Sequence, residues 1–192
     1  MTYLKFINED LSLTHKLKAL EKKVFLASNL IYETLKNNNK IFICGNGGSA
    51  ADAEHLSAEF LVRLRPKVDR KPLPVIALTQ GVSTITACSN DYSYHEVFKR
   101  NFEAMSSKDD LLICLSTSGN SESIKRVLNF TKKKNNKSLV FFGNKKGKCH
   151  GIANHEILIP SKKVAKIQEA YMMMCHYIFA QVEDKLIKNY FD

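Results

Sequence analysis

The sequence lacks any segment that would place it in a membrane or export it. No apolar run approaches the roughly 18 to 20 residues that cross a bilayer, although 44% of the 192 residues are hydrophobic. Residues 1–5 also lack the basic region, apolar stretch and small-residue cleavage site that mark a secretion signal. These absences predict a cytoplasmic protein with no membrane partner.

Cysteine is scarce, and its spacing forms no pair. The five cysteines are an odd number, none belongs to a Cys-x-x-Cys motif, and two of them lie inside apolar runs. They are Cys44, Cys88, Cys114, Cys149 and Cys175. We therefore expect buried free thiols rather than disulfides or a zinc knuckle.

Acidic residues are in the minority, with 19 against 29 lysines and arginines, so the formal net charge is +10. A basic chain often binds nucleic acid. Here, however, the lysines cluster at positions 132–134, 145–148 and 162–163, without alternating aromatic residues and without a known nucleic-acid motif. An anionic substrate would gain from the same positive field, and such a substrate is the expectation we adopt.

The first forty residues have a helical pattern. From Leu17 to Leu35, apolar residues recur at intervals of three and four, and the asparagines at 37–39 end the pattern. Little nearby sequence is available to cover this apolar stripe. We therefore expect residues 1–38 to be a helical extension that packs against other copies of the chain.

The rest of the chain alternates between short apolar runs and helical segments. The runs cover residues 41–44, 75–78, 111–115, 139–142 and 157–159, and Gly, Asn, Ser or Pro bounds each of them. Such runs are typical of parallel strands that are buried on both faces. A long helix is expected at about 164–188. The prediction is an α/β fold over residues 1–192, a three-layer αβα sandwich with a five-stranded parallel sheet and an N-terminal helical extension, in a single domain.

Ligands of an open parallel sheet bind at the carboxyl ends of the strands, and a glycine-rich segment follows the first predicted strand. It reads Gly45-Asn46-Gly47-Gly48-Ser49 and leads into a helical segment at 50–64. Glycines allow a tight turn with exposed amides, and the helix N-terminus adds partial positive charge. An anion site and a merely structural turn both remain open.

A serine-rich segment, Ser116-Thr117-Ser118-Gly119-Asn120-Ser121, follows the third predicted strand. Four hydroxyl groups converge on a helix that starts near Glu122, and no acidic residue lies among them. This chemistry suits a phosphate monoester, which carries acceptor oxygens and negative charge. A serine-rich helix cap would explain one hydroxyl group but not four.

Two helices carry further polar residues. His55 and Glu59 are four residues apart and share a helix face, with Asp52 and Arg63 near it. On the final helix, Gln168 and His176 are eight residues apart on roughly one side, among apolar neighbours. A solvated face on the first helix and satisfied core polar groups on the second are the alternatives to a functional role.

Taken together and in this order, these motifs resemble those of the phosphoheptose isomerases in the SIS (sugar isomerase) family. The resemblance runs from about residue 40 to 180 and also includes Ser89-Asn90-Asp91 and the Ile167-Gln168-Glu169 motif. It implies conversion of sedoheptulose 7-phosphate to D-glycero-D-manno-heptose 7-phosphate, in the synthesis of ADP-heptose precursors for lipopolysaccharide or capsule. It further implies a homotetramer with active sites at subunit interfaces. One departure is Ala165, where the family often has an acidic residue.

The resemblance also implies one Zn²⁺ per subunit, with His55, Glu59, Gln168 and His176 as the ligands. Isomerisation through an enediol needs a base and a proton donor, and we assign Glu59 and His176 to these roles. The predicted substrate-binding residues come from both loops, both helices and the Ser89-Asn90-Asp91 motif. They are Asn46, Gly47, Gly48, Ser49, Glu59, Arg63, Asn90, Asp91, Ser116, Thr117, Ser118, Ser121 and Gln168.

The zinc site has a physical difficulty. Residues eight apart on one helix are separated by about 12 Å along its axis, whereas a zinc ligand lies only about 2 Å from the ion. Gln168 and His176 must therefore lean toward each other, or another subunit must supply one of them. The alternative function is a non-catalytic SIS protein that binds a sugar phosphate or a replication-initiator partner. The presence of all four candidate ligands favours the enzyme.

Overall fold

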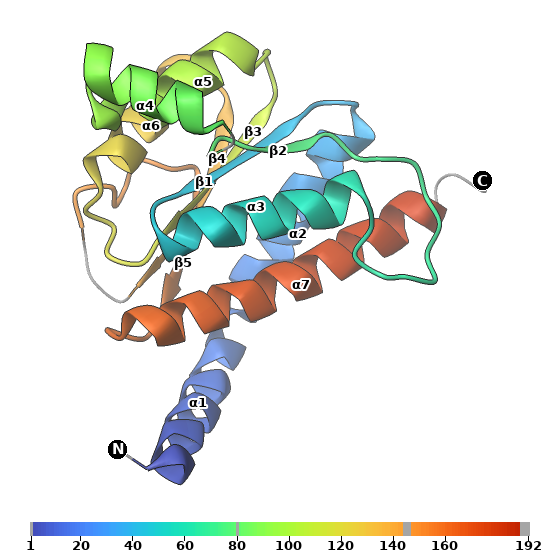
Figure 1. Cartoon of the computed structure of the whole chain (residues 1–192). Helices are drawn as coiled ribbons and strands as arrows, with labels where there is room; N and C mark the ends of the chain where they lie inside the picture. Colours follow the sequence, from blue (N-terminus) through green and yellow to red (C-terminus); the bar gives the residue numbers. More distant parts are fainter. Residues whose placement is uncertain (1, 80, 144–146, 189–192) are drawn as a thin grey trace.

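The computed structural model describes residues 2–79, 81–143 and 147–188. Five strands form one sheet, and helices cover both of its faces (Figure 1). The strands are β1 (Ile41–Gly45), β2 (Val75–Ala77), β3 (Leu111–Ser116), β4 (Lys137–Gly143) and β5 (His155–Ile159). The α-helices are α1 (Tyr3–Leu17), α2 (Glu21–Lys36), α3 (Gly48–Leu61), α4 (Val82–Asp91), α5 (Val97–Met105), α6 (Glu122–Lys133) and α7 (Val164–Lys188). Short 3₁₀ helices, η1 (Lys18–Leu20) and η2 (Tyr94–Glu96), complete the elements.

All neighbouring strands are parallel, in the order β2-β1-β3-β4-β5. Side chains alternate between the two faces of a strand, so each continuous apolar run supplies both layers. In β1, for example, Ile43 packs with α2, α3 and α7, whereas Phe42 and Cys44 pack with α4, α5 and α6. The predicted three-layer sandwich with a five-stranded parallel sheet is confirmed.

The N-terminal segment differs from the expectation. The 3₁₀ turn at Lys18–Leu20 divides it into two helices, and α2 buries Val24, Ala27, Ile31 and Leu35 in the chain's own core. The apolar stripe is therefore covered by α7 and the sheet, which sequence proximity does not reveal. By contrast, α1 projects away from the body (Figure 1) and buries only Leu13. The oligomerisation role of residues 1–38 stays a prediction.

The order of the strands creates one special position in the sheet. The chain passes from β1 to β2 on one side and then to β3 on the other side of β1, so the connections diverge between β1 and β3. Ligands of open α/β sheets bind in the crevice at such a switch point. The glycine loop (residues 45–49) and the serine loop (residues 116–121) leave these two strands, where Gly45 is paired with Leu115.

The five cysteines are free and buried, as expected. Burial raises the pKa of Cys149 to about 11 and also raises the pKa values of Cys114 and Cys175, so these thiols stay protonated. Among the helices of the described residues, none combines the length and apolarity needed to span a membrane. Lys145 and Lys146 of the second lysine cluster lie outside the described residues.

Candidate functional site

The glycine loop makes a tight turn between β1 and α3. Gly47 has φ +58° and ψ −124°, a backbone conformation that residues with a Cβ rarely adopt. The amide of Ser49 donates to the carbonyl oxygen of Asn46 at 3.1 Å, and the amide of Ala50 donates to that of Gly47 at 2.9 Å. The turn therefore directs the N-terminus of α3 toward the crevice between β1 and β3, where it favours an anion.

Asn46 connects the two loops. Its Nδ2 atom donates to Ser121 Oγ at 2.7 Å and lies 3.1 Å from Ser123 Oγ, at the start of α6. Tyr94 Oη donates to Asn46 Oδ1 at 2.5 Å. Sequence reasoning missed Tyr94 and Ser123, because neither belongs to a glycine- or serine-rich motif. The side chain of Asn46 therefore holds the rim of the crevice together, in addition to any contact with a sugar.

The serine loop is shaped by its own hydrogen bonds. Ser116 Oγ accepts from the amide of Gly119, and Ser118 Oγ accepts from the amide of Asn120, both at 3.2 Å. Gly119 has φ +66°, which lets the loop fold back over the end of β3. Ser121 is the N-cap residue of α6, yet its side chain makes no capping hydrogen bond. The hydroxyl of Ser121 faces Asn46, so the helix-cap alternative does not account for it.

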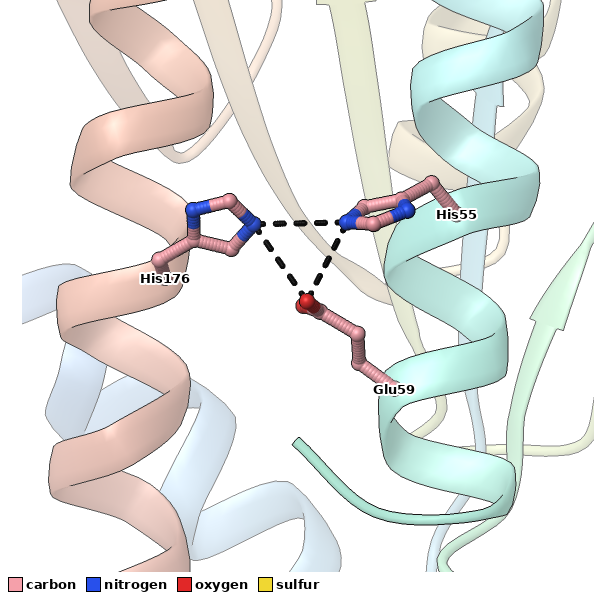
Figure 2. Close-up of side chains that lie close together, drawn as sticks. All are labelled: His55, Glu59 and His176. Carbon is pink, nitrogen blue, oxygen red and sulfur yellow. Dashed lines mark hydrogen bonds and ion pairs between the residues drawn. The ribbon is translucent and has the colours of Figure 1, made fainter. Parts of the chain in front are cut away.

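Three side chains from α3 and α7 converge on one point (Figure 2). Glu59 Oε1 lies 3.1 Å from His55 Nε2 and 3.3 Å from His176 Nε2, and the two Nε2 atoms are 3.4 Å apart. His55 and Glu59 share a face of α3 because they are four residues apart. We call His55, Glu59 and His176 the His–Glu triangle.

The dimensions of the triangle fit a metal ion. A tetrahedral zinc site with ligands at about 2.0–2.1 Å has about 3.3 Å between its ligand atoms, which is close to the three distances observed. Both histidines are about half exposed, whereas Glu59 is largely buried. The second carboxylate oxygen, Glu59 Oε2, is buried and has no hydrogen-bond partner in the described part of the chain. Three ligands with an open fourth direction are typical of catalytic rather than structural zinc sites.

Gln168 lies about one helical turn away from the triangle. Its Nε2 atom is 3.5 Å from Asp52 Oδ2, and it packs against Gly48, where a Cβ atom would collide with it. Asp52 precedes His55 by three residues, so these two residues are about 4.5 Å apart along the axis of α3. Within one chain, Gln168 therefore faces the glycine loop, and its role as a metal ligand stays a prediction.

Tyr171 is a buried residue that sequence reasoning counted among the apolar residues of the last helix. Its hydroxyl donates to the carboxylate of Asp52 and lies 3.0 Å from Ser49 Oγ. Burial and the hydrogen bond to Asp52 raise the pKa of Tyr171, so the phenol stays protonated and can donate. Ser49 is consequently buried against Tyr171, and its expected contact with the substrate stays a prediction.

The predicted helix at 50–64 is too long. It ends at Leu61, where the guanidinium group of Arg70 donates hydrogen bonds to the carbonyl oxygens of Glu59 and Phe60 in place of helical amides. Arg63 therefore lies beyond α3 and is exposed, rather than near the helix face that carries His55 and Glu59.

The remaining sequence candidates lie at helix ends. Asn90 and Asp91 are exposed at the end of α4, where Asn90 Nδ2 donates to Asp91 Oδ1 at 2.9 Å. Ala165 is exposed in the first turn of α7. The glycine loop and the His–Glu triangle thus share α3, and Asn46 joins the serine loop to the glycine loop, whereas these residues lie at other helix termini.

Comparisons with known proteins identify the family of this chain. Residues 3–144 match the SIS domain family. Phosphoheptose isomerase from Aliarcobacter butzleri is 39% identical over 181 residues, which are 94% of this chain and 95% of the relative. Phosphoheptose isomerase from Helicobacter pylori strain P12 is 38% identical over 93% of this chain and 92% of the relative. A solved phosphoheptose isomerase structure from Francisella tularensis has a TM-score of 0.89 at 30% identity and covers 96% of this chain and 100% of that chain.

Proposed function

We propose a mechanism on the premise that this chain belongs to the SIS domain family and, within it, to the phosphoheptose isomerases. The chain is an isomerase that converts sedoheptulose 7-phosphate to D-glycero-D-manno-heptose 7-phosphate in heptose biosynthesis. The observation that carries the proposal is the His–Glu triangle, two of whose residues lie on α3, the helix that begins within the glycine loop. No observation favours a non-catalytic, partner-binding role.

The reaction moves a proton from C1 to C2 and the carbonyl group from C2 to C1. Glu59 is the proposed base that removes the proton from C1, because Oε2 is a carboxylate oxygen without a partner among the described residues. His176 is the proposed donor of a proton to the carbonyl oxygen, which completes the enediol. Glu59 then delivers its proton to C2, and His176, which has given up its proton, accepts the proton of the C1 hydroxyl group, which leaves the aldehyde at C1.

Zn²⁺ is the proposed cofactor, one per subunit, with His55, Glu59 and His176 as ligands and Gln168 as the fourth predicted ligand. The support is that the side-chain atoms of the triangle are 3.1–3.4 Å apart, which is close to the spacing of ligand atoms in a tetrahedral zinc site. A bound zinc ion would act as a Lewis acid toward the carbonyl group. His176 Nε2 cannot bind a metal and donate a proton at the same time. Its role as a metal ligand and its role as a proton donor therefore exclude each other.

The serine loop and the N-terminus of α6 are the proposed phosphate site. Ser116, Thr117, Ser118 and Ser121 supply hydroxyl groups there, and a helix N-terminus favours an anion. The predicted contacts of Asn46, Arg63, Asn90 and Asp91 with the sugar belong to the same proposal.

We also propose a cytoplasmic homotetramer with active sites at subunit interfaces. The support is a groove of about 680 Å³ between α2 and α7, which contains the exposed side chains of Phe25 and Tyr177. The His–Glu triangle is also open on one side, since His55 and His176 are about half exposed. Apolar surface of this kind is typical of contacts between subunits.

The test is a turnover assay with sedoheptulose 7-phosphate, before and after chelation. We expect conversion by the untreated protein, loss of conversion with a chelator and recovery with Zn²⁺. Conversion that survives complete chelation would refute the metal and leave His176 as the proton donor. Absence of conversion under every condition would refute the proposed function.

A further inference from the structure

Arg70 joins the two helices that carry the His–Glu triangle. Its side chain is only 5% exposed. On one side, Nε donates to Glu183 Oε1 on α7 at 2.7 Å. On the other side, Nη2 donates to the carbonyl oxygen of Glu59, and Nη1 donates to that of Phe60, both at 2.9 Å.

These carbonyl groups belong to the last turn of α3, which has no further helical amides to satisfy them. The guanidinium group donates to both, the amide of Leu73 also donates to the carbonyl oxygen of Phe60 at 3.2 Å, and the positive charge is favourable at a helix C-terminus. Since Glu59 is one of the residues so bound, Arg70 fixes the backbone from which the triangle's carboxylate projects.

Glu183 provides the fixed point on α7. It is 1% exposed, and both of its carboxylate oxygens are occupied, Oε1 by Arg70 and Oε2 by Arg65 at 2.7 Å. It follows His176 by seven residues, which is about two helical turns or 10.5 Å. Between them, Phe179 packs on Phe60 of α3 with ring centroids 3.9 Å apart. These contacts therefore fix how α3 is aligned with α7, at a position next to the triangle along both helices.

We infer that Arg70, held by Glu183, is a positioning residue for the His–Glu triangle. The inference rests on the proposed function, in which this triangle is the reacting and metal-binding centre. Two ligands come from α3 and one from α7, so their mutual distances depend on how the two helices are aligned. Arg70 contacts the backbone of Glu59 and the helix of His176 at once. Functional geometries of this kind tolerate displacements of only about 0.5 Å.

The test compares Arg70→Lys with Arg65→Lys. Lysine keeps the positive charge, but it lacks the planar fork that binds Glu183 and two carbonyl groups together. Arg65 is the matched control because it binds the same Glu183 and the neighbouring Asp184, at 2.6 Å, and within the described part of the chain its side chain donates no hydrogen bond to the carbonyl groups of α3. Cobalt(II) serves as the probe, because its absorption spectrum reports the ligand geometry without any substrate.

We expect Arg70→Lys to weaken cobalt binding by about 10- to 100-fold, the usual effect of removing support behind a metal ligand. Its cobalt spectrum should also change, and kcat should fall while KM stays within about twofold. Arg65→Lys should leave all three properties close to those of the parent. Thermal melting of the metal-free proteins compares the stability of the two variants. Should Arg70→Lys fail to fold, Glu183→Gln decides, with the same expectations at smaller amplitude.

Equal losses of cobalt affinity in both lysine variants would overturn the inference, because the network would then only stabilise the fold. Unchanged cobalt binding and kcat in Arg70→Lys would overturn it as well. A parent protein that isomerises the sugar but binds no cobalt overturns this inference and leaves the reaction intact. A parent protein that binds cobalt without turnover refutes the proposed function, and the cobalt affinities of the variants still decide the role of Arg70.

Discussion

At the scale of single residues, the two carboxylate oxygens of Glu59 have different surroundings. Oε1 is within 3.3 Å of both histidines, and Oε2 is buried without a partner among the described residues. An unpaired buried carboxylate oxygen is costly to maintain. The cost is reasonable where that oxygen takes part in chemistry, because a substrate can then become its partner.

Glu59→Gln tests this assignment directly. The change keeps the size of the side chain but removes the base, so turnover should fall by at least about 100-fold in a protein that remains folded. Glu54→Gln is the control, since Glu54 is exposed on the same helix. Turnover is measured in heavy water, where the parent should incorporate some deuterium at the carbon next to the carbonyl group. Near-parental turnover of Glu59→Gln would show that the proposed base is wrong.

The serine loop gives a second prediction at this scale. Ser118→Ala combined with Ser121→Ala removes two hydroxyl groups from the proposed phosphate site. We expect KM for sedoheptulose 7-phosphate to rise by at least about tenfold, because each lost hydrogen bond to a charged group costs about 1.5–3 kcal/mol. The parent should use the dephosphorylated sugar poorly. Equal turnover of the phosphorylated and dephosphorylated sugars by the parent would exclude the loop as a phosphate site.

At the scale of elements, the conformation of Gly47 shapes the junction between β1 and α3. Gly47→Ala should cost about 1–3 kcal/mol of folding free energy, because φ +58° with ψ −124° is unfavourable for alanine. It should also raise KM, since the turn positions the glycine loop. Gly151→Ala is the control, because Gly151 also has a positive φ, of +79°, and open space around it. We expect this control to lose stability without a change in KM, as measured by denaturant unfolding and steady-state kinetics. If the KM of Gly47→Ala equalled that of the parent, the turn would have no role in substrate binding and the prediction would be wrong.

The sequence predicted most of the elements, because the strands are short apolar runs separated by helices. The final helix, at 164–188, and all five strands were located within a few residues. The end of α3 was not, because Arg70 acts on it from outside the helix. The convergence of His55 and Glu59 with His176 was suggested only by resemblance, since the pattern within α7 does not reveal which turn faces α3. Tyr171 and Tyr94 were missed because their polar atoms act only through tertiary contacts.

At the scale of the whole molecule, the predicted tetramer concerns the surface that α2 and α7 leave open. Phe25 is 58% exposed and Tyr177 is 56% exposed, on opposite sides of the groove between these helices. Light scattering should give about four times the chain mass of 21.8 kDa. Phe25→Glu combined with Tyr177→Glu should lower this mass, because a charge is costly in a buried contact. Met105→Glu is the control, because Met105 is exposed at the end of α5 and lies outside this groove. A parent mass near 22 kDa at micromolar concentration would contradict the prediction.

The His–Glu triangle also has a consequence for biosynthesis. His55 and His176 are 121 residues apart, and strands β2 to β5 are all translated between them. Chains emerge from the ribosome at about 5–20 residues per second, so α3 is exposed for seconds before α7 exists. Capture of the proposed metal by the complete triangle must therefore follow the docking of α7. A nascent chain stalled before residue 164 should take up no zinc at this site, whereas a chain that has released α7 should.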